Sequence, residues 1–464
     1  MRVRMPLLLA IPLIAAASCA GGTATEQATA VTAVVGVDVI PMDAERVLRD
    51  QTVIVRDGVI AEIGDRGAVR LPADAARLDG SGRFLIPGLV DMHVHLRDSS
   101  ELLSYLAYGV TSVVHMSGPM ANLPDVVDLR RRVAAGEIPG PAVYTTGRML
   151  DGDPPINPDV SVAVRTPQEA RAAVEAQIEA GVDFIKVYNN LDEGALRAAV
   201  AAAHARGLGV FGHIPRAGGR EQALQRALDA GLDVIAHGEE YFFTFFHGGV
   251  EDRLDAGEVP WIPPDRRSDA ARLSRRAGVA VIPNLSFVAM TRAQLDDLSG
   301  VLADPEARFL RPEVLAMWKR RSPATRPDID RFDRRERAKY QFVREFTAAL
   351  SEAGVPLMVG TDASAPGLFP GKSAHLEIRE LAGAGLTAYD ALSAGTRVPA
   401  AFIASHRGGM AFGTITTGSR ADAILLRGNP LEDIAHLSAI DGIFVRGRWL
   451  TSADLRALRD NARR

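Results

Sequence analysis

The sequence predicts an α/β protein, a (β/α)8 TIM barrel with a small β-sandwich domain formed from both chain flanks. Two observations lead to this fold class. In the middle of the chain, one short sequence motif recurs: an Ala-rich helical stretch is followed by Gly and then by a short apolar run. The flanks carry short strand-like runs separated by turn residues instead.

The recurring motif marks junctions between a helix and the strand that follows it. Gly just past a helix suits the left-handed conformation, and the apolar run suits a strand buried in a parallel sheet. The glycines of the motif are Gly109, Gly181, Gly207, Gly231, Gly278 and Gly354. With two further strands that end near His95 and Thr146, we expect strands at 88–95, 110–115, 142–146, 182–187, 208–213, 232–237, 279–284 and 356–361.

Eight such units favour a closed barrel over an open sheet. No Gly-x-Gly-x-x-Gly follows the first strand, so the main sequence argument for a dinucleotide fold is missing. Longer spacers at about 239–270 and 286–345 follow strands six and seven. Insertions there lie over the active-site end of a barrel, and we expect them to act as lid or specificity segments.

The flanks predict a second, smaller unit. Thr52–Arg56 and Val59–Ile63 surround Asp57-Gly58, which is a hairpin signal, and 413–450 has similar short runs. Neither flank alone has enough strands for a stable sheet. The expected organisation is a signal peptide at 1–19, a flexible tether at 20–32, the two parts of the β-sandwich at 33–86 and 406–450, the barrel at 87–405 and a C-terminal tail at 451–464.

Composition limits the partners. The chain has 464 residues, 47% of them hydrophobic, and a formal net charge of −4 with both signs mixed. It can bury a sizeable core, and no basic region suggests nucleic acid. A small-molecule substrate is expected, and a homo-oligomer is compatible with the sequence. The single cysteine, Cys19, excludes an internal disulfide framework and a cysteine metal cluster.

The N-terminus predicts export. Arg2 and Arg4 precede an apolar run from Met5 to Ala17, which is typical of a signal peptide and too short to span a bilayer. Ala16-Ala17-Ser18-Cys19 resembles a bacterial lipobox, which predicts a periplasmic or membrane-anchored lipoprotein of the cell envelope with its lipid on Cys19. Ordinary cleavage near Ala20, with Cys19 discarded, is the competing interpretation.

Polar residues gather where the predicted strands end. Alternate residues of a barrel strand point inward, and functional groups belong at the carboxyl ends. Each of these residues alone has an ordinary explanation, such as a hydrogen-bonded core histidine or an internal ion pair. Together they are hard to explain as packing, and His93 and His95, two apart on one face, can bind one metal ion. The six residues are His93, His95, Lys186, His213, His237 and Asp362.

Lys186 stands between apolar residues of strand four. A charged lysine is expensive to bury unless it is paired or modified, and burial lowers its pKa. The neutral amine can take up carbon dioxide and form a carbamate, an anion able to bridge two divalent ions.

Several motifs together resemble the amidohydrolase superfamily. Leu85 to His95, with Lys186, His213, His237 and Thr361-Asp362, is similar to its metal-binding signature. Asp57 to Gly64, Gly413 to Ala423 and Gly428 to Leu431 are similar to its flanking β-domain segments. The resemblance covers roughly 33–450 and points to the imidazolonepropionase-related group with prolidase-like and Xaa-Arg dipeptidases and ochratoxin-type amidases.

The resemblance implies two divalent ions, zinc in the simplest case. His93, His95 and Asp362 would hold the first, His213 and His237 the second, and carbamylated Lys186 would lie between them. A metal-activated hydroxide would be the nucleophile, with Asp362 moving its proton to the leaving amine.

Substrate contacts are expected from Tyr188, which shares the inward face with Lys186, and from His115 at the end of strand two. Either one has a purely structural alternative. Arg216 and His375 are further candidates near the site.

The expected activity is hydrolysis of an amide or peptide C–N bond in a dipeptide or N-acyl amino acid. Two alternatives stay open at this point: a lactonase or organophosphate esterase that uses the same binuclear site, and a catalytically inactive metal-dependent binding lipoprotein.

Overall fold

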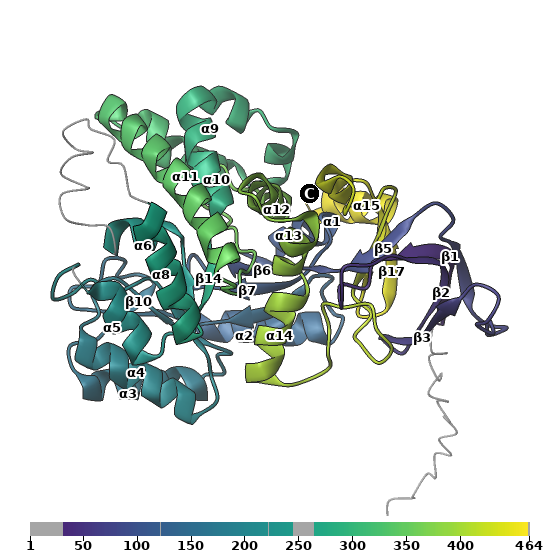
Figure 1. Cartoon of the computed structure of the whole chain (residues 1–464), viewed down its shortest axis with the longest axis horizontal. Helices are drawn as coiled ribbons and strands as arrows, with labels where there is room; N and C mark the ends of the chain where they lie inside the picture. Colours follow the sequence, from purple (N-terminus) through teal and green to yellow (C-terminus); the bar gives the residue numbers. More distant parts are fainter. Residues whose placement is uncertain (1–30, 121, 221, 245–263, 463–464) are drawn as a thin grey trace, which may run out of the picture.

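Parallel strands and helices alternate through the middle of the chain in the computed structural model, which describes residues 31–120, 122–220, 222–244 and 264–462 (Figure 1). The predicted signal peptide, Cys19 and most of the predicted tether lie outside these residues. No helix among the described residues is long and apolar enough to cross a bilayer.

The central strands are short. They are β6 (Leu89–Val94), β7 (Val110–His115), β8 (Ala142–Thr145), β9 (Met149–Asp151), β10 (Ser161–Ala163), β11 (Ile185–Val187), β12 (Val210–Gly212), β13 (Val234–Ala236) and β14 (Ala280–Ile282). The helices are α1 (Leu102–Ala107), α2 (Leu123–Ala134), α3 (Pro167–Glu179), α4 (Glu193–Ala205), α5 (Ala223–Ala230), α6 (Glu239–Thr244), α8 (Pro264–Ala277), α9 (Leu285–Leu302), α10 (Pro312–Arg321), α11 (Ile329–Glu352), α12 (Lys372–Gly383), α13 (Ala388–Ala394) and α14 (Arg397–Arg407).

The glycine junctions have the predicted backbone conformation. All six glycines of the recurring motif have positive φ, from 72° at Gly109 to 94° at Gly181. A side chain at such a position would strain the backbone, so glycine allows each helix to stop and the next strand to begin at once.

The parallel strands form two sheets, β6-β7-β8 and β10-β9-β11-β12-β13-β14. Phe184 N, just before β11, donates to Thr145 O of β8 at 3.2 Å and links the two sheets. On the other side, Met92 N of β6 donates to Val359 O, in the predicted eighth strand, at 2.8 Å. The predicted eighth strand, 356–361, is not a regular strand and pairs with β14 only at an isolated bridge between Val281 and Leu357. Pro356 has no N–H to donate, which contributes to this irregularity.

Side chains on the inner face of the parallel strands pack together in one buried cluster. Phe184 and Phe211 precede Lys186 and His213 by two residues, so they lie one layer deeper on the same face. Ile403 of α14 joins this cluster from the last helix of the central unit. Strict alternation with His93 would turn Met92 toward the helices, but Met92 packs in the same inner cluster, because the register of β6 shifts between Asp91 and Val94.

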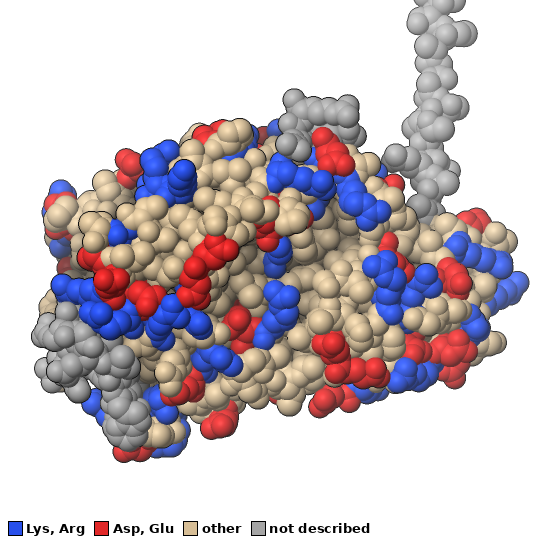
Figure 2. Space-filling view, turned by 90° about the horizontal axis from the view of Figure 1, so that it is seen from above, with Lys and Arg blue, Asp and Glu red and all other residues tan. Residues whose placement is uncertain are grey.

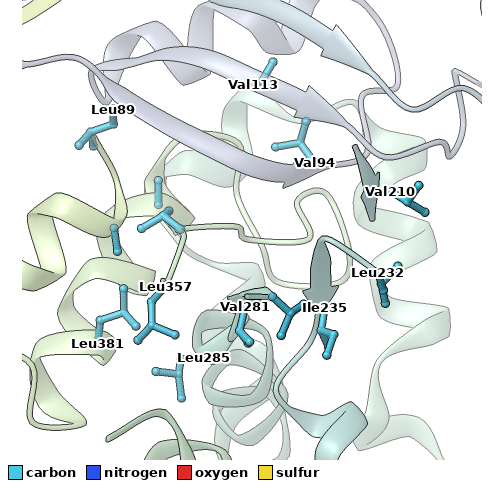
Figure 3. Close-up of a cluster of buried hydrophobic side chains, with 14 of the residues drawn as sticks. Leu89, Val94, Val113, Val210, Leu232, Ile235, Val281, Leu285, Leu357 and Leu381 are labelled. Atoms are coloured by element: carbon cyan, nitrogen blue, oxygen red, sulfur yellow. The ribbon is translucent and has the colours of Figure 1, made fainter. Parts of the chain in front are cut away.

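A second apolar layer joins the strands to the surrounding helices (Figure 3). Val210, Ile235 and Val281 project from their strands, and Leu285 of α9 and Leu381 of α12 belong to the same buried cluster. The strands are therefore covered by apolar side chains on both faces, which explains their continuous apolar sequence.

Both flanks contribute to one eight-stranded sheet at one end of the molecule (Figure 1). Its order is β17-β16-β15-β5-β1-β2-β3, with β4 beside β1, from β1 (Thr32–Val39), β2 (Leu48–Arg56), β3 (Val59–Asp65), β4 (Ala76–Asp79), β5 (Phe84–Pro87), β15 (Ala423–Leu426), β16 (Ile440–Val445) and β17 (Arg448–Thr451). The pairing of β5 with β15 joins segments more than 330 positions apart, as expected for flanks that cannot fold alone. The segment predicted as a tail forms α15 (Ser452–Ala462), which packs against α1.

The two predicted insertions form helices beside the carboxyl ends of the strands. α9, α10 and α11 extend from the long spacer after β14, and α6 follows β13 (Figure 1). Positions 245–263 of the first spacer lie outside the described residues. Acidic and basic side chains are interspersed on the face shown in Figure 2, in agreement with the mixed charge pattern of the sequence.

Candidate metal centre

Six side chains from five strand ends converge as predicted. His93 lies near the end of β6, and His95 follows that strand directly. Lys186 lies in β11, and His213 and His237 follow β12 and β13 directly. Asp362 follows the irregular eighth segment. Five of them line a cavity of about 790 Å³, and His93 lies fully buried beside them. We call the six residues the cavity floor.

His93, His95 and Asp362 form the tightest group of the floor. Oδ1 of Asp362 lies 2.8 Å from His95 Nε2 and 3.3 Å from His93 Nε2, and the two imidazole nitrogens are 3.3 Å apart. Their ligand atoms all lie within 4.8 Å of one another, so one ion could contact all three.

Lys186 of β11 extends toward the same group of ligand atoms. Its Nζ lies 3.3 Å from His93 Nε2 and 3.5 Å from the carbonyl oxygen of Met116. Burial lowers the pKa of Lys186 to about 8, against the opposing effect of the Asp362 carboxylate. A lysine in this state has a larger neutral fraction near neutral pH than an exposed one, which favours chemistry at its amine.

His213 and His237 complete the floor on the other side of His93. The ring centroids of His213 and His237 are 4.8 Å apart, and those of His237 and His93 are also 4.8 Å apart. Behind His213, Oε1 of the buried Glu240 lies 3.0 Å from Nδ1. A carboxylate on the rear nitrogen of an imidazole orients the ring and directs its other nitrogen outward.

The floor residues are in the protonation states that ligands need. Burial lowers the pKa of His93 and His213 well below the usual value and that of His237 to about 4, so these imidazoles are neutral at pH 7. Burial alone would raise the pKa of Asp362, but its hydrogen bond with His95 and the nearby basic groups outweigh burial and lower it to about 2.

Two floor residues have an unusual backbone. His237 and Asp362 have φ values of 72° and 64°, in the left-handed region that residues other than glycine seldom adopt. His237 N donates to Ile282 O at 2.9 Å, and Asp362 N donates to His93 O at 2.8 Å, so neighbouring strands hold the conformation. Strain of this kind is typical of residues held in place for function.

The donor set fits a divalent transition metal. Imidazole nitrogens and a carboxylate are the ligands that catalytic zinc sites use. His93 Nε2, His95 Nε2 and Asp362 Oδ1 lie within 3.3 Å of one another, so three ligand atoms already face one point. Lys186 as a carbamate would add an oxygen donor between the two halves of the floor.

The four predicted substrate contacts lie in different places. Tyr188 lines the cavity, and its ring centroid is 4.2 Å from that of His213. His115 is buried and has both ring nitrogens bound to backbone: Nδ1 accepts from Leu96 N, and Nε2 donates to Met120 O.

Arg216 pairs with the buried Glu240 at 3.0 Å, and His375 donates from Nε2 to the carbonyl oxygen of Tyr108 at 2.8 Å. Of the four, the geometry brings Tyr188 into the cavity and ties His115, Arg216 and His375 to other protein groups.

The cavity wall contains residues that the sequence pattern did not single out. Glu239, Phe287, Met317 and Arg321 come from the two insertions, and we call these four the insertion wall. Arg97, just past the first strand, also lines the cavity. Glu239 could have been suspected from the sequence, because it stands only two residues after His237. The wall residues of α9 and α10 lie far along the chain from any strand end, so the strand pattern does not predict them.

A comparison with protein families matches residues 84–450 to the amidohydrolase family. This span includes the whole cavity floor and most of the described chain. Curated relatives match only in short segments, so the chain covers roughly a tenth to a fifth of their length. They include a dihydroorotase of Anaeromyxobacter dehalogenans, 47% identical over 51 residues (11% of each chain), and an imidazolonepropionase of Mycolicibacterium smegmatis, 54% identical over 50 residues (11% of this chain and 12% of that protein).

Solved structures match over almost the whole chain. A bottromycin amidohydrolase has a TM-score of 0.72 at 24% identity, over 93% of this chain and 90% of that one. A prolidase-like protein from Bifidobacterium longum has a TM-score of 0.68 at 24% identity, over 93% and 99%. The ochratoxinase of A. niger has a TM-score of 0.65 at 19% identity, over 91% and 96%. These proteins share the fold with this chain.

Proposed function

Because the chain belongs to the amidohydrolase family, we propose that it is a metal-dependent hydrolase that cleaves an amide or peptide C–N bond of a small substrate. We propose further that the two parallel sheets and the segment 356–361 act as one closed (β/α)8 barrel. The convergence of four imidazoles, one lysine and one carboxylate at the carboxyl ends of its strands is the observation that carries the proposal.

His93, His95 and Asp362 would hold one divalent ion, and His213 and His237 a second, with Lys186 as a carbamate between them. Such ions lower the pKa of coordinated water to about 7 and polarise a carbonyl group. The protein supplies neutral imidazoles, an ionised carboxylate and a lysine with lowered pKa, which is the set of protonation states that this centre needs.

Asp362 is the proposed general base and acid. Its carboxylate is ionised, lines the cavity and can accept a proton from the attacking water and return it to the leaving amine. Tyr188 lines the same cavity and is proposed to donate a hydrogen bond to the substrate carbonyl as negative charge develops on its oxygen.

The wall supports a small substrate with polar and apolar parts. A cavity of about 790 Å³ accommodates a molecule the size of a dipeptide. Met149, Ile156, Phe287 and Met317 give it apolar contact surface. Arg97 and Arg321 also line the cavity, and Arg97 Nε donates to Ser364 Oγ at 2.9 Å. We propose that the Arg321 guanidinium binds a substrate carboxylate.

The test is a screen of the purified, zinc-loaded protein against dipeptides and N-acyl amino acids, with lactones and phosphotriesters as competing classes. We expect cleavage in the amide set and its loss when a chelator removes the metal. Cleavage of lactones or phosphotriesters alone would replace the amidase proposal. Tight binding without turnover in every set would favour a binding protein.

We also propose that the protein is exported and anchored through Cys19. Fractionation of the producing cells, with mass spectrometry of the mature N-terminus, would distinguish lipidation at Cys19 from cleavage near Ala20.

A further inference from the structure

Glu239 is a carboxylate on the cavity wall that the proposed mechanism does not use. It begins α6, two residues after His237, and lines the cavity together with His213 and Asp362. Its side chain is 16% exposed, so part of it faces the cavity and the rest is buried in protein.

Lys339 holds Glu239 from behind. Lys339 Nζ lies 2.7 Å from Oε2 of Glu239 and 2.6 Å from Oε2 of Glu336, which is one turn earlier on α11. Lys339 and Glu336 are 7% and 3% exposed. The contact joins the two insertions, because Glu239 belongs to the spacer after β13 and Lys339 to the spacer after β14.

The other oxygen of Glu239 remains available. No described residue donates a hydrogen bond to Oε1, and Lys339 is the only described cation in contact with the carboxylate. Lys339 is shared with Glu336, so two carboxylates meet one ammonium group. A fixed, partly buried carboxylate on a cavity wall binds a protonated amine more strongly than a mobile surface carboxylate does.

We propose that Glu239 binds the free ammonium group of the substrate, which makes the substrate a dipeptide or another aminoacyl amide, and not an N-acyl amino acid. This inference rests on the proposed function and chooses between the two substrate classes that it leaves open. The α-ammonium is favoured over a side-chain amine, because Glu239 lies next to the floor and the α-amine is attached one carbon from the scissile carbonyl.

The test compares L,L-dipeptides with the same dipeptides carrying an N-acetyl group, which removes the charge and keeps the scissile bond. N-acetyl-lysyl dipeptides form a third series, in which the only amine is on the side chain. We expect the wild-type protein to favour the free dipeptides by about 10- to 100-fold in kcat/KM, the range of a charged hydrogen bond. Glu239→Gln should remove most of this preference.

Glu239→Gln is expected to fold, because Lys339 keeps its contact with Glu336. Thermal unfolding and bound zinc are measured beside activity. Glu345→Gln is the matched control: it makes the same chemical change on α11 at a carboxylate that is 40% exposed and paired with Arg267. The control should keep the wild-type preference.

The outcomes separate the two proposals. If no series is cleaved, the proposed function fails. If acetylated and free dipeptides react equally well, or Glu239→Gln keeps the wild-type preference, the hydrolase proposal stands and the role of Glu239 is wrong. Preference for the N-acetyl-lysyl series would mean that Glu239 binds a side-chain amine, and would overturn the α-ammonium assignment. Loss of zinc in Glu239→Gln would make Glu239 a metal ligand instead.

Discussion

The cavity floor and the insertion wall are in contact, yet the chain builds them in different ways. The floor takes one or two side chains from each of five segment ends, and polar atoms of His93, His95, Lys186 and Asp362 lie 2.8–3.3 Å from their neighbours. The wall takes its side chains from α6, α9 and α10, whose positions depend on contacts such as Lys339 with Glu239. In the proposed function, chemistry depends on the floor and substrate choice on the wall.

The largest effect is expected from Asp362→Asn in the floor. An amide cannot accept the proton of the attacking water, so kcat should fall by about 10²- to 10⁴-fold. Substrate affinity, measured by calorimetry, should change much less. Asp128→Asn, at an exposed carboxylate on α2, is the control. Unchanged turnover in Asp362→Asn would contradict the catalytic role of the floor.

Lys186→Met tests the link between the two halves of the floor. Methionine retains the apolar stem but cannot form a carbamate, so bound zinc should fall to roughly half and activity should fall with it. Metal analysis by mass spectrometry checks the stoichiometry, with Lys319→Met as an exposed control on α10. If zinc content stays at the wild-type level, Lys186 is not a bridging ligand.

Met317→Ala tests whether the insertion wall affects substrate choice without affecting metal binding. Removing an apolar contact should lower kcat/KM for substrates with a large apolar group by about tenfold. The zinc content should stay constant, because Met317 lines the cavity and is not one of the six proposed ligand residues. Met410→Ala, at a methionine that is 49% exposed, makes the same change at the surface. A loss of zinc in Met317→Ala would show that wall and floor are not separable.

The smallest effect is expected at His115, which we assign to neither region. Burial lowers the pKa of His115 to about 3, whereas an unfolded chain protonates histidine near 6.5. Between these values the unfolded state binds the extra proton, so stability falls as pH decreases. At pH 5 this amounts to about 2 kcal/mol. His115→Gln should reduce the difference in Tm between pH 7 and pH 5, and an unchanged difference would contradict this role.

His115 also shows the limit of prediction from the sequence. Like His93 and His213, it stands at the end of an apolar strand, and the strand pattern predicts that all three side chains face the cavity. The structure distinguishes them, because His115 binds Leu96 N and Met120 O while the other two face ligand groups. Which way an imidazole turns depends on backbone groups from other strands, and no local pattern contains that information.

The amino-acid sequence by itself determined the alternation of helices and parallel strands, the left-handed glycines between them and the six residues of the cavity floor. These features repeat with the geometry of a single strand or helix, so nearby residues are enough to predict them. Only the tertiary structure decided the irregular eighth segment, the inward packing of Met92 and the contact between Lys339 and Glu239. Each of these depends on which distant segments meet, and burial and close packing select that arrangement only when the whole chain has folded.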